Sequence, residues 1–194
     1  GDGEDRPQEL GDLLCKGYEN IDKVITADRV KRSEGLFFKF CYLVHKYLTF
    51  IFTGQSIKFG NYTCLPKFAV NMMAQQASTW SSFSGSLAKT IKNRTSVSSI
   101  RGERYFGPSK MSFISLLKHS LSIMAVFKTT LLIRSIIFLI IYLFLVIGKI
   151  SVITLIPVIA VIIMMFLVIT LSKRENKSEF DKSLENINSI DKIK

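Results

Sequence analysis

Two adjacent apolar runs, 131-LLIRSIIFLIIYLFLVI-147 and 150-ISVITLIPVIAVIIMMFLVITL-171, decide the fold of this 194-residue chain. Each approaches the roughly 20 residues that an α-helix needs to cross about 30 Å of hydrocarbon. Only Gly148 and Lys149 separate them, so we predict a hairpin of two transmembrane helices over 131–171. The alternative is a pair of buried core helices, but the rest of the chain is too short to cover both with a soluble shell.

The formal net charge is +11, and basic residues gather at the two outer ends of this hairpin. These flanking residues are Lys110, Lys118 and Lys128 before the first run and Lys173, Arg174 and Lys177 after the second. Positive residues collect on the cytoplasmic side of a membrane. We therefore expect an integral protein of the inner or plasma membrane, with both ends cytoplasmic, including the polar tail 172–194. Charge placed beside membrane spans also argues against a nucleic-acid partner.

The part of the chain before the spans, 1–110, has the pattern of an α/β fold. Pro7 begins the stretch PQELGDLLCKGY, which predicts a short helix with proline in its first turn. KVITADR at 23–29 and the stretch 92–100 predict strands, because they combine β-branched residues with short length. A helix that leads into a strand indicates a layered, mostly parallel sheet.

Two amphipathic helices are predicted beside the spans. SEGLFFKFCYLVHKYLTFIFT at 33–53 carries a wide apolar stripe at helical period, interrupted by Lys39 and Lys46. The stretch 111–128 carries a similar stripe and joins the first span almost directly. Segment 33–53 is too charged to span a membrane. A core helix and a helix that lies in the membrane interface both fit its pattern.

Carboxylates cluster at the start of the chain, where Asp2, Glu4 and Asp5 precede the first predicted helix. Such oxygen ligands can hold Mg²⁺ or Mn²⁺ beside a diphosphate. Acidic residues also gather at helix N-termini because they interact favourably with the helix dipole. Both interpretations stay open on these residues alone.

The stretch 104-RYFGPSK-110 lies directly before the second amphipathic helix. Gly107 permits a sharp turn and Pro108 stiffens it. Arg104 and Lys110 are then presented from the two ends of one loop, with the Ser109 hydroxyl between them. This arrangement suits a diphosphate or a lipid phosphate. The alternative is that these residues only orient the spans.

A second basic cluster, Arg29 and Arg32, precedes the helix predicted at 33–53. With it, a sequence of motifs is complete: DGEDRPQEL, ADRVKR, an amphipathic helix, IKFGNYTCLPKFAV, RYFGPSKMS and a membrane hairpin. This order resembles the C-terminal two-thirds of a family 2 glycosyltransferase of the dolichol-phosphate mannose synthase and polyprenyl-phosphate glycosyltransferase type. The resemblance runs from Gly1 to about Leu171.

The resemblance implies a partial GT-A (Rossmann-like) catalytic domain over 1–110, with interfacial helices and a C-terminal transmembrane hairpin. It implies transfer of a sugar from a nucleotide-sugar to a polyprenyl (dolichyl or undecaprenyl) phosphate, with inversion and with Mg²⁺ or Mn²⁺. By their places in the motifs, Asp2 and Glu4 match metal-side acids and Arg29 and Arg32 match residues that face phosphates. Arg104 and Lys110 match the pair that grips phosphate, with Ser109 as a lesser contact. Asp2, Arg104 and Lys110 would be the catalytic residues.

Two departures from the family pattern matter. The first acid of the D-x-D motif and the nucleotide-binding half would lie before Gly1, so we expect an N-terminally truncated chain that is inactive by itself. IKFGNYTCL departs from the commoner Asp-containing form, which leaves the sugar and the lipid acceptor open. A homo-oligomer is compatible with the sequence. The alternative function is a non-enzymatic two-span membrane protein whose basic segments set topology or recruit partners.

Overall fold

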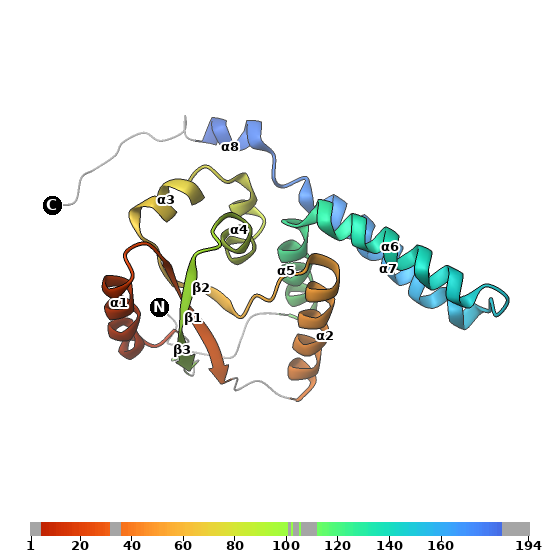
Figure 1. The fold of residues 1–194 in the computed structure, drawn as a ribbon, viewed down its shortest axis with the longest axis horizontal. Coiled ribbons are helices and arrows are strands. Elements are labelled where there is room, and N and C mark those ends of the chain that lie inside the picture. The colour runs from red at the N-terminus through yellow and green to blue at the C-terminus, as the bar shows by residue number, and fades with distance from the viewer. Residues whose placement is uncertain (1–4, 32–35, 101, 103–104, 106–111, 184–194) are drawn as a thin grey trace.

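The computed structural model describes residues 5–31, 36–100, 102, 105 and 112–183 of the chain (Figure 1). The first part of the chain forms a mixed domain of one small sheet and several helices. Its elements are η1 (Pro7–Glu9), α1 (Leu10–Glu19), β1 (Val24–Lys31), α2 (Leu36–Thr53), β2 (Phe59–Cys64), α3 (Lys67–Met73), η2 (Ala77–Trp80), α4 (Phe83–Thr90) and β3 (Arg94–Ile100). The second part is helical and consists of α5 (Phe113–Ala125), α6 (Lys128–Val146), α7 (Val152–Ser172) and α8 (Lys177–Ser183).

The sheet has three strands in the order β2-β1-β3. β1 and β3 are parallel, with Val24 opposite Arg94, whereas β1 and β2 are antiparallel. The sheet is therefore mixed, and the prediction of a mostly parallel sheet holds for the β1–β3 pair only. Residues 54–58 return the chain from the end of α2 to the level of Asp28, where β2 begins opposite β1. The chain re-enters near the carboxyl end of β1, so β2 runs back along it.

The core of the domain forms on both faces of β1, because successive side chains of a strand point to opposite faces. Val24 packs with Leu87 of α4 and Ala69 of α3 on one face. Ile25 packs with Leu13 of α1 on the other. The predicted α/β class is confirmed at this level, while the GT-A architecture stays a prediction.

α6 and α7 form an antiparallel hairpin that extends away from the domain (Figure 1). Gly148, whose φ is +88°, lies in the turn, and the capping box of Ser151 and Thr154 begins α7. Only 11 % of each apolar window is buried inside the protein, so these are not core helices of a soluble domain. Both helices are long and apolar enough to cross a membrane. The predicted helices at 131–147 and 150–171 are thus confirmed as helices, with bounds shifted by a few residues.

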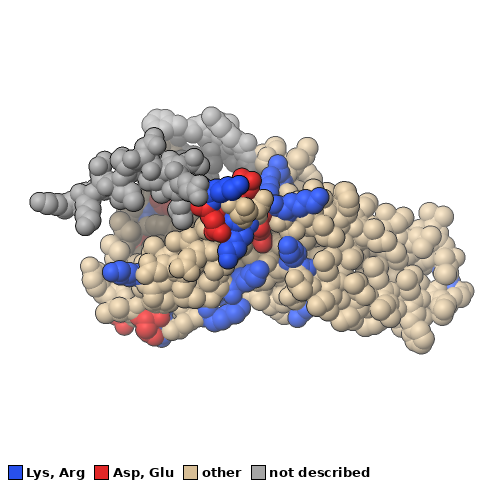
Figure 2. Space-filling view, turned by 90° about the horizontal axis from the view of Figure 1, so that it is seen from above, with Lys and Arg blue, Asp and Glu red and all other residues tan. Residues whose placement is uncertain are grey.

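The base of the hairpin is held against the domain by α2 and α5, the two predicted amphipathic helices. Phe52 of α2 and Met124 of α5 pack in one buried cluster with Leu131 of α6 and Val168 of α7. Figure 2 shows blue basic side chains where the domain meets the hairpin, while the hairpin beyond is almost entirely tan up to its tip. On this face, the apolar hairpin therefore projects beyond a group of basic side chains at its base.

Candidate functional site

The carboxyl ends of β1 and β3 lie side by side and define one edge of the sheet. The last pairs in register are Arg29 with Ser99 and Lys31 with Ile100. Ligands of parallel α/β sheets bind outside the carboxyl ends of the strands. The chain leaves this edge at residues 32 and 101, and the predicted phosphate-binding residues lie next to these points in sequence: Arg29 and Arg32 at the first, and Arg104, Ser109 and Lys110 after the second.

Most of the predicted site residues lie outside the described part of the chain. Arg32, Arg104, Ser109 and Lys110 belong to the two segments that leave the edge. Of Arg29, the backbone is described, and it lies at the edge in register with Ser99. The structure therefore brings the attachment points of the two basic segments together and leaves the positions of their side chains as predictions.

The start of the chain is tied to the same edge through Glu9. Its carboxylate accepts a hydrogen bond from Ser99 Oγ at 2.6 Å and one from the Ile100 backbone N–H at 2.8 Å. Nearby, Tyr62 Oη donates to the carbonyl oxygen of Arg6 at 3.2 Å. Residues 5–9 are thus fixed beside the end of β3. Asp2 and Glu4, which precede them, lie outside the described residues.

Negatively charged side chains near this edge affect the pKa of Tyr62. Burial raises this pKa, and the negative charges of Glu9 and Asp5 raise it further. The phenol consequently stays protonated and remains a hydrogen-bond donor to Arg6. Glu9 and Asp5 thus place negative charge near Tyr62, whereas the predicted metal- and phosphate-binding side chains lie outside the described residues.

The metal prediction rests on residues that the structure does not describe. In the described ranges, no group of three or more His, Cys, Asp or Glu side chains is arranged to hold a metal ion. Both carboxylate oxygens of Glu9 already accept hydrogen bonds from β3. Asp2 and Glu4, the metal ligands that the resemblance implies, lie outside the described residues and stay a prediction.

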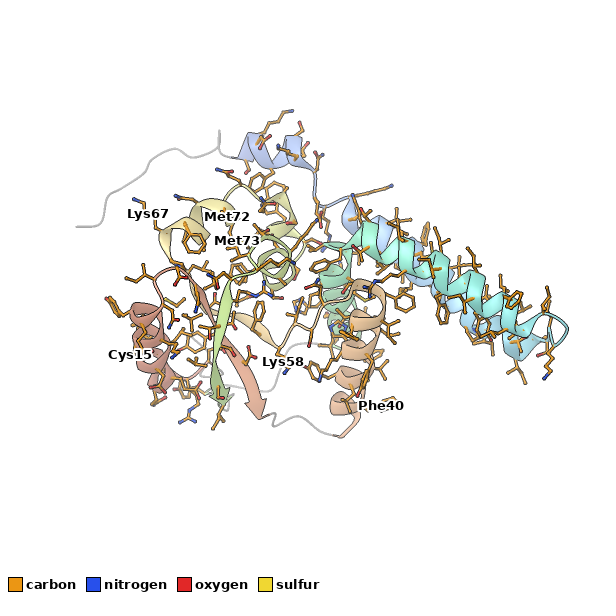
Figure 3. The ribbon with its side chains drawn as sticks, viewed as in Figure 1. Cys15, Phe40, Lys58, Lys67, Met72 and Met73 are labelled. Carbon is orange, nitrogen blue, oxygen red and sulfur yellow. The ribbon has the colours of Figure 1, made fainter. Side chains whose placement is uncertain are left out.

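Each basic segment continues into a helix that packs against the hairpin. Segment 32–35 leads into α2, which contacts α6, and segment 101–111 leads into α5, which contacts α7. Phe40 of α2 is 64 % exposed and lies on the side away from the sheet (Figure 3). The outer faces of α2 and α5 also expose Tyr47 and Ile114. Both helices thus carry exposed apolar side chains, as helices in a membrane interface would require.

Arg94 is an important basic residue that the sequence analysis did not single out. Its guanidinium donates to the carbonyl oxygens of Ala88, at 3.1 Å, and Ile91 at the end of α4, and it lies over the Phe59 ring at 5.7 Å. Burial lowers its pKa. Arg94 therefore closes the end of α4 inside the domain and is not directed to a ligand. Nothing in the local sequence separates it from the other basic residues, because its partners depend on how α4 packs.

The chain matches no protein-family model, no curated protein and no solved structure. What the sheet edge can do therefore follows from its own side chains and charges, together with the resemblance of the motifs.

Proposed function

We propose that the chain is the acceptor-side part of a membrane-bound glycosyltransferase that moves a sugar from a nucleotide-sugar to a polyprenyl phosphate. One observation supports this above the others. The acidic N-terminal segment and both basic segments are attached at one edge of the sheet, and both basic segments continue into helices packed on an apolar hairpin. A site that joins a water-soluble donor to a lipid acceptor needs that combination.

The chemistry follows from the charges. An oxygen of the lipid phosphate attacks the anomeric carbon of the sugar while the bond from that carbon to the nucleoside diphosphate breaks, which inverts the centre. The attacking phosphate is already ionised, so no strong general base is required. Arg29, Arg32, Arg104 and Lys110 hold the donor and acceptor phosphates, with the Ser109 hydroxyl as an additional donor, because preorganised cations stabilise the charge that develops on the leaving group.

Asp2 and Glu4 are the residues that would hold Mg²⁺ or Mn²⁺. Such an ion would neutralise the charge of the departing diphosphate. This chain would contribute the two carboxylates, and Glu9, five residues after Glu4, is bound to the end of β3.

The proposed topology places the domain on the cytoplasmic face. α6 begins and α7 ends beside the domain, so both ends of the hairpin lie on the same side (Figure 1). Lys128, Lys173 and Arg174 flank these ends, whereas the far turn carries Lys149. The positive-inside rule then orients the hairpin with its turn outside the inner or plasma membrane.

The test uses the complete gene product that contains this chain, expressed in membranes. A panel of radiolabelled UDP- and GDP-hexoses is supplied with polyprenyl phosphate, with and without Mn²⁺. We expect a lipid-linked product that depends on the metal, and a loss of about 100-fold or more for Arg104→Gln/Lys110→Gln. Lys16→Gln/Lys67→Gln removes the same charge on the side of the domain away from the hairpin and keeps full activity. Absence of any lipid-linked product would refute the proposal.

The second candidate is a non-enzymatic two-span membrane protein. The flanking charges Lys128, Lys173 and Arg174 favour it, because a role in orienting the hairpin is enough to explain their positions. This function predicts that Arg104→Gln/Lys110→Gln changes no transfer reaction. The same assay therefore separates the two candidates.

A further inference from the structure

A groove of about 240 Å³ lies between the domain and the base of the hairpin. Its polar lining comes from separate parts of the chain: Lys89 near the end of α4 and Lys92 just after it, Thr129 and Thr130 at the start of α6, and Gln55 after α2. Lys92 lies two residues before β3, at the amino end of the parallel strands. The candidate site lies at the other end of these strands, and seven residues of strand correspond to about 20 Å.

The two lysines keep donors for a ligand. Lys89 Nζ donates to the carbonyl oxygen of Val126 at 2.9 Å, and Lys92 Nζ is 3.4 Å from the carbonyl oxygen of Ala88. An ammonium group has three N–H donors, so each of these bonds uses one of three. The Lys89 bond also fixes that side chain across the junction between α4 and the hairpin. The groove therefore presents ammonium groups held by backbone carbonyls on its own walls.

The start of α6 adds to the positive potential. Thr129 and Thr130 lie in its first turn, and the first N–H groups of a helix have no acceptor within the helix. The N-terminal end of a 19-residue helix also carries the positive end of the helix dipole. Hydroxyl groups, backbone donors and two ammonium groups are the donor set of a phosphate site.

Glu175 is an acidic group that interacts electrostatically with this cluster, because the charges of Lys89 and Lys128 lower its pKa. Its Oε1 is buried without a hydrogen-bond partner among the described residues. Burial raises the pKa of Glu175. When Glu175 is ionised, its charge offsets part of the charge of Lys89.

We propose that this groove binds the phosphate of an anionic membrane phospholipid, at a site separate from the sheet edge. The depth favours a lipid. Thr129 and Thr130 come directly before Leu131, where the apolar run begins, so the groove lies at the level of the headgroups once α6 crosses a membrane. A bound headgroup would fix the tilt of the domain relative to the hairpin, because its contacts join α4 to α6. The inference does not depend on the glycosyltransferase proposal.

The experiment uses the full chain in nanodiscs of phosphatidylcholine with a small fraction of spin-labelled lipid. Electron paramagnetic resonance measures the lipid immobilised by the protein, for labelled phosphatidylglycerol and for labelled phosphatidylcholine. We expect a preference for phosphatidylglycerol that falls about fivefold for each lysine lost in Lys89→Gln/Lys92→Gln, since each basic residue near the surface contributes about that factor. The matched variant Lys16→Gln/Lys67→Gln removes two lysines of α1 and α3, Lys16 being paired with Glu19 on the surface and Lys67 exposed, and keeps the wild-type preference.

Two further measurements, on variants that keep the junction and with added phosphate, can refute the proposal. Lys89→Gln can loosen the junction, so Lys92→Gln and Thr129→Val/Thr130→Val, which keep the Lys89–Val126 bond, are measured as well and are expected to lower the preference. Inorganic phosphate is added against sodium chloride of equal ionic strength. Displacement by phosphate beyond that of chloride would identify a free-phosphate site and overturn the lipid assignment. An unchanged preference in folded Lys92→Gln and Thr129→Val/Thr130→Val would overturn the site itself.

Discussion

The domain and the hairpin are both rich in apolar residues, but the domain buries many of them and the hairpin exposes most of them. In the domain, Ile25 and Leu87 have no exposed surface. In the hairpin, Ile140 is 64 % exposed and Phe144 is 76 % exposed. The two regions contain the same kinds of apolar residue, but in the hairpin they form two almost unbroken runs. The difference is that the domain builds its own interior, whereas the outer face of the hairpin requires an apolar surrounding such as a bilayer.

The largest expected effect contrasts one leucine from each region. Leu87→Ala removes a fully buried side chain of α4 and should lower the free energy of unfolding by about 3 kcal/mol. Leu145→Ala removes a side chain that is 72 % exposed on α6 and should lower it by less than about 0.5 kcal/mol. Denaturant unfolding of the purified protein, followed by the fluorescence of Trp80, the one tryptophan of the chain, measures both. Equal losses would mean that the outer face of the hairpin is covered by protein.

The second effect concerns Arg134, which joins the two regions. It lies on α6 among apolar residues, and its Nη1 donates to the carbonyl oxygens of Phe50 at 3.4 Å and Ile51 at 3.0 Å near the end of α2. It therefore holds the C-terminus of α2, beside Gly54, whose φ of +73° ends the helix.

Arg134→Met should therefore loosen the last turn of α2 without unfolding the domain. Hydrogen bonds from a charged donor contribute about 1.5 kcal/mol or more, so we expect amide exchange of Phe50 to Gly54 to speed up about tenfold. Hydrogen–deuterium exchange with mass spectrometry follows these amides. Arg134→Lys keeps the charge but loses the planar fork, and should give a smaller increase. If both variants exchange as the wild type does, the contact does not support α2.

These contrasts show which features local sequence can predict. The hairpin, β1 and β3 were predicted because their signals are local: long apolar runs and short β-branched stretches. The direction of β2 was not predicted, because it depends on the path that residues 54–58 take between α2 and the sheet. Local sequence does not predict α8 either, because Phe180 in this helix packs on Trp80, 100 residues earlier in the chain.

The candidate site shows the same limit. Glu9 and Ser99 are 90 residues apart in sequence, and no periodicity connects them. The backbone of Arg29 pairs with Ser99 at this edge, which local sequence does not predict. The roles of Asp2, Arg104 and Lys110 stay predictions.

The third effect concerns the return of the chain from the hairpin to the domain. The rings of Phe180 in α8 and Trp80 in η2 meet edge to face, with centroids 5.2 Å apart. Such a pair contributes about 1 kcal/mol. Phe180→Ala should release α8 and shift the emission of Trp80 to longer wavelength, whereas Tyr18→Ala, which removes an aromatic ring 82 % exposed on α1, should not. An unchanged emission maximum would place α8 away from Trp80 in solution.

The smallest effect concerns Glu175, at the boundary between the two regions. Burial raises its pKa above the ordinary value of 4.5, against the opposing influence of Lys89 and Lys128. The folded protein therefore holds this proton more tightly than the unfolded chain does. The contribution to stability is fully present below the ordinary pKa and is lost as the pH rises through the raised value. Glutamine has no proton to lose and avoids this loss.

Glu175→Gln should consequently gain thermal stability relative to the wild type as the pH rises from about 4 to neutrality, by about 1 °C. Melting temperatures over this range, recorded in one detergent, give the difference. Glu179→Gln, at an exposed position in α8, serves as the control and should show no such trend. A difference that shrinks as the pH rises would mean that Lys89 and Lys128 outweigh burial, and that the junction holds Glu175 as a carboxylate.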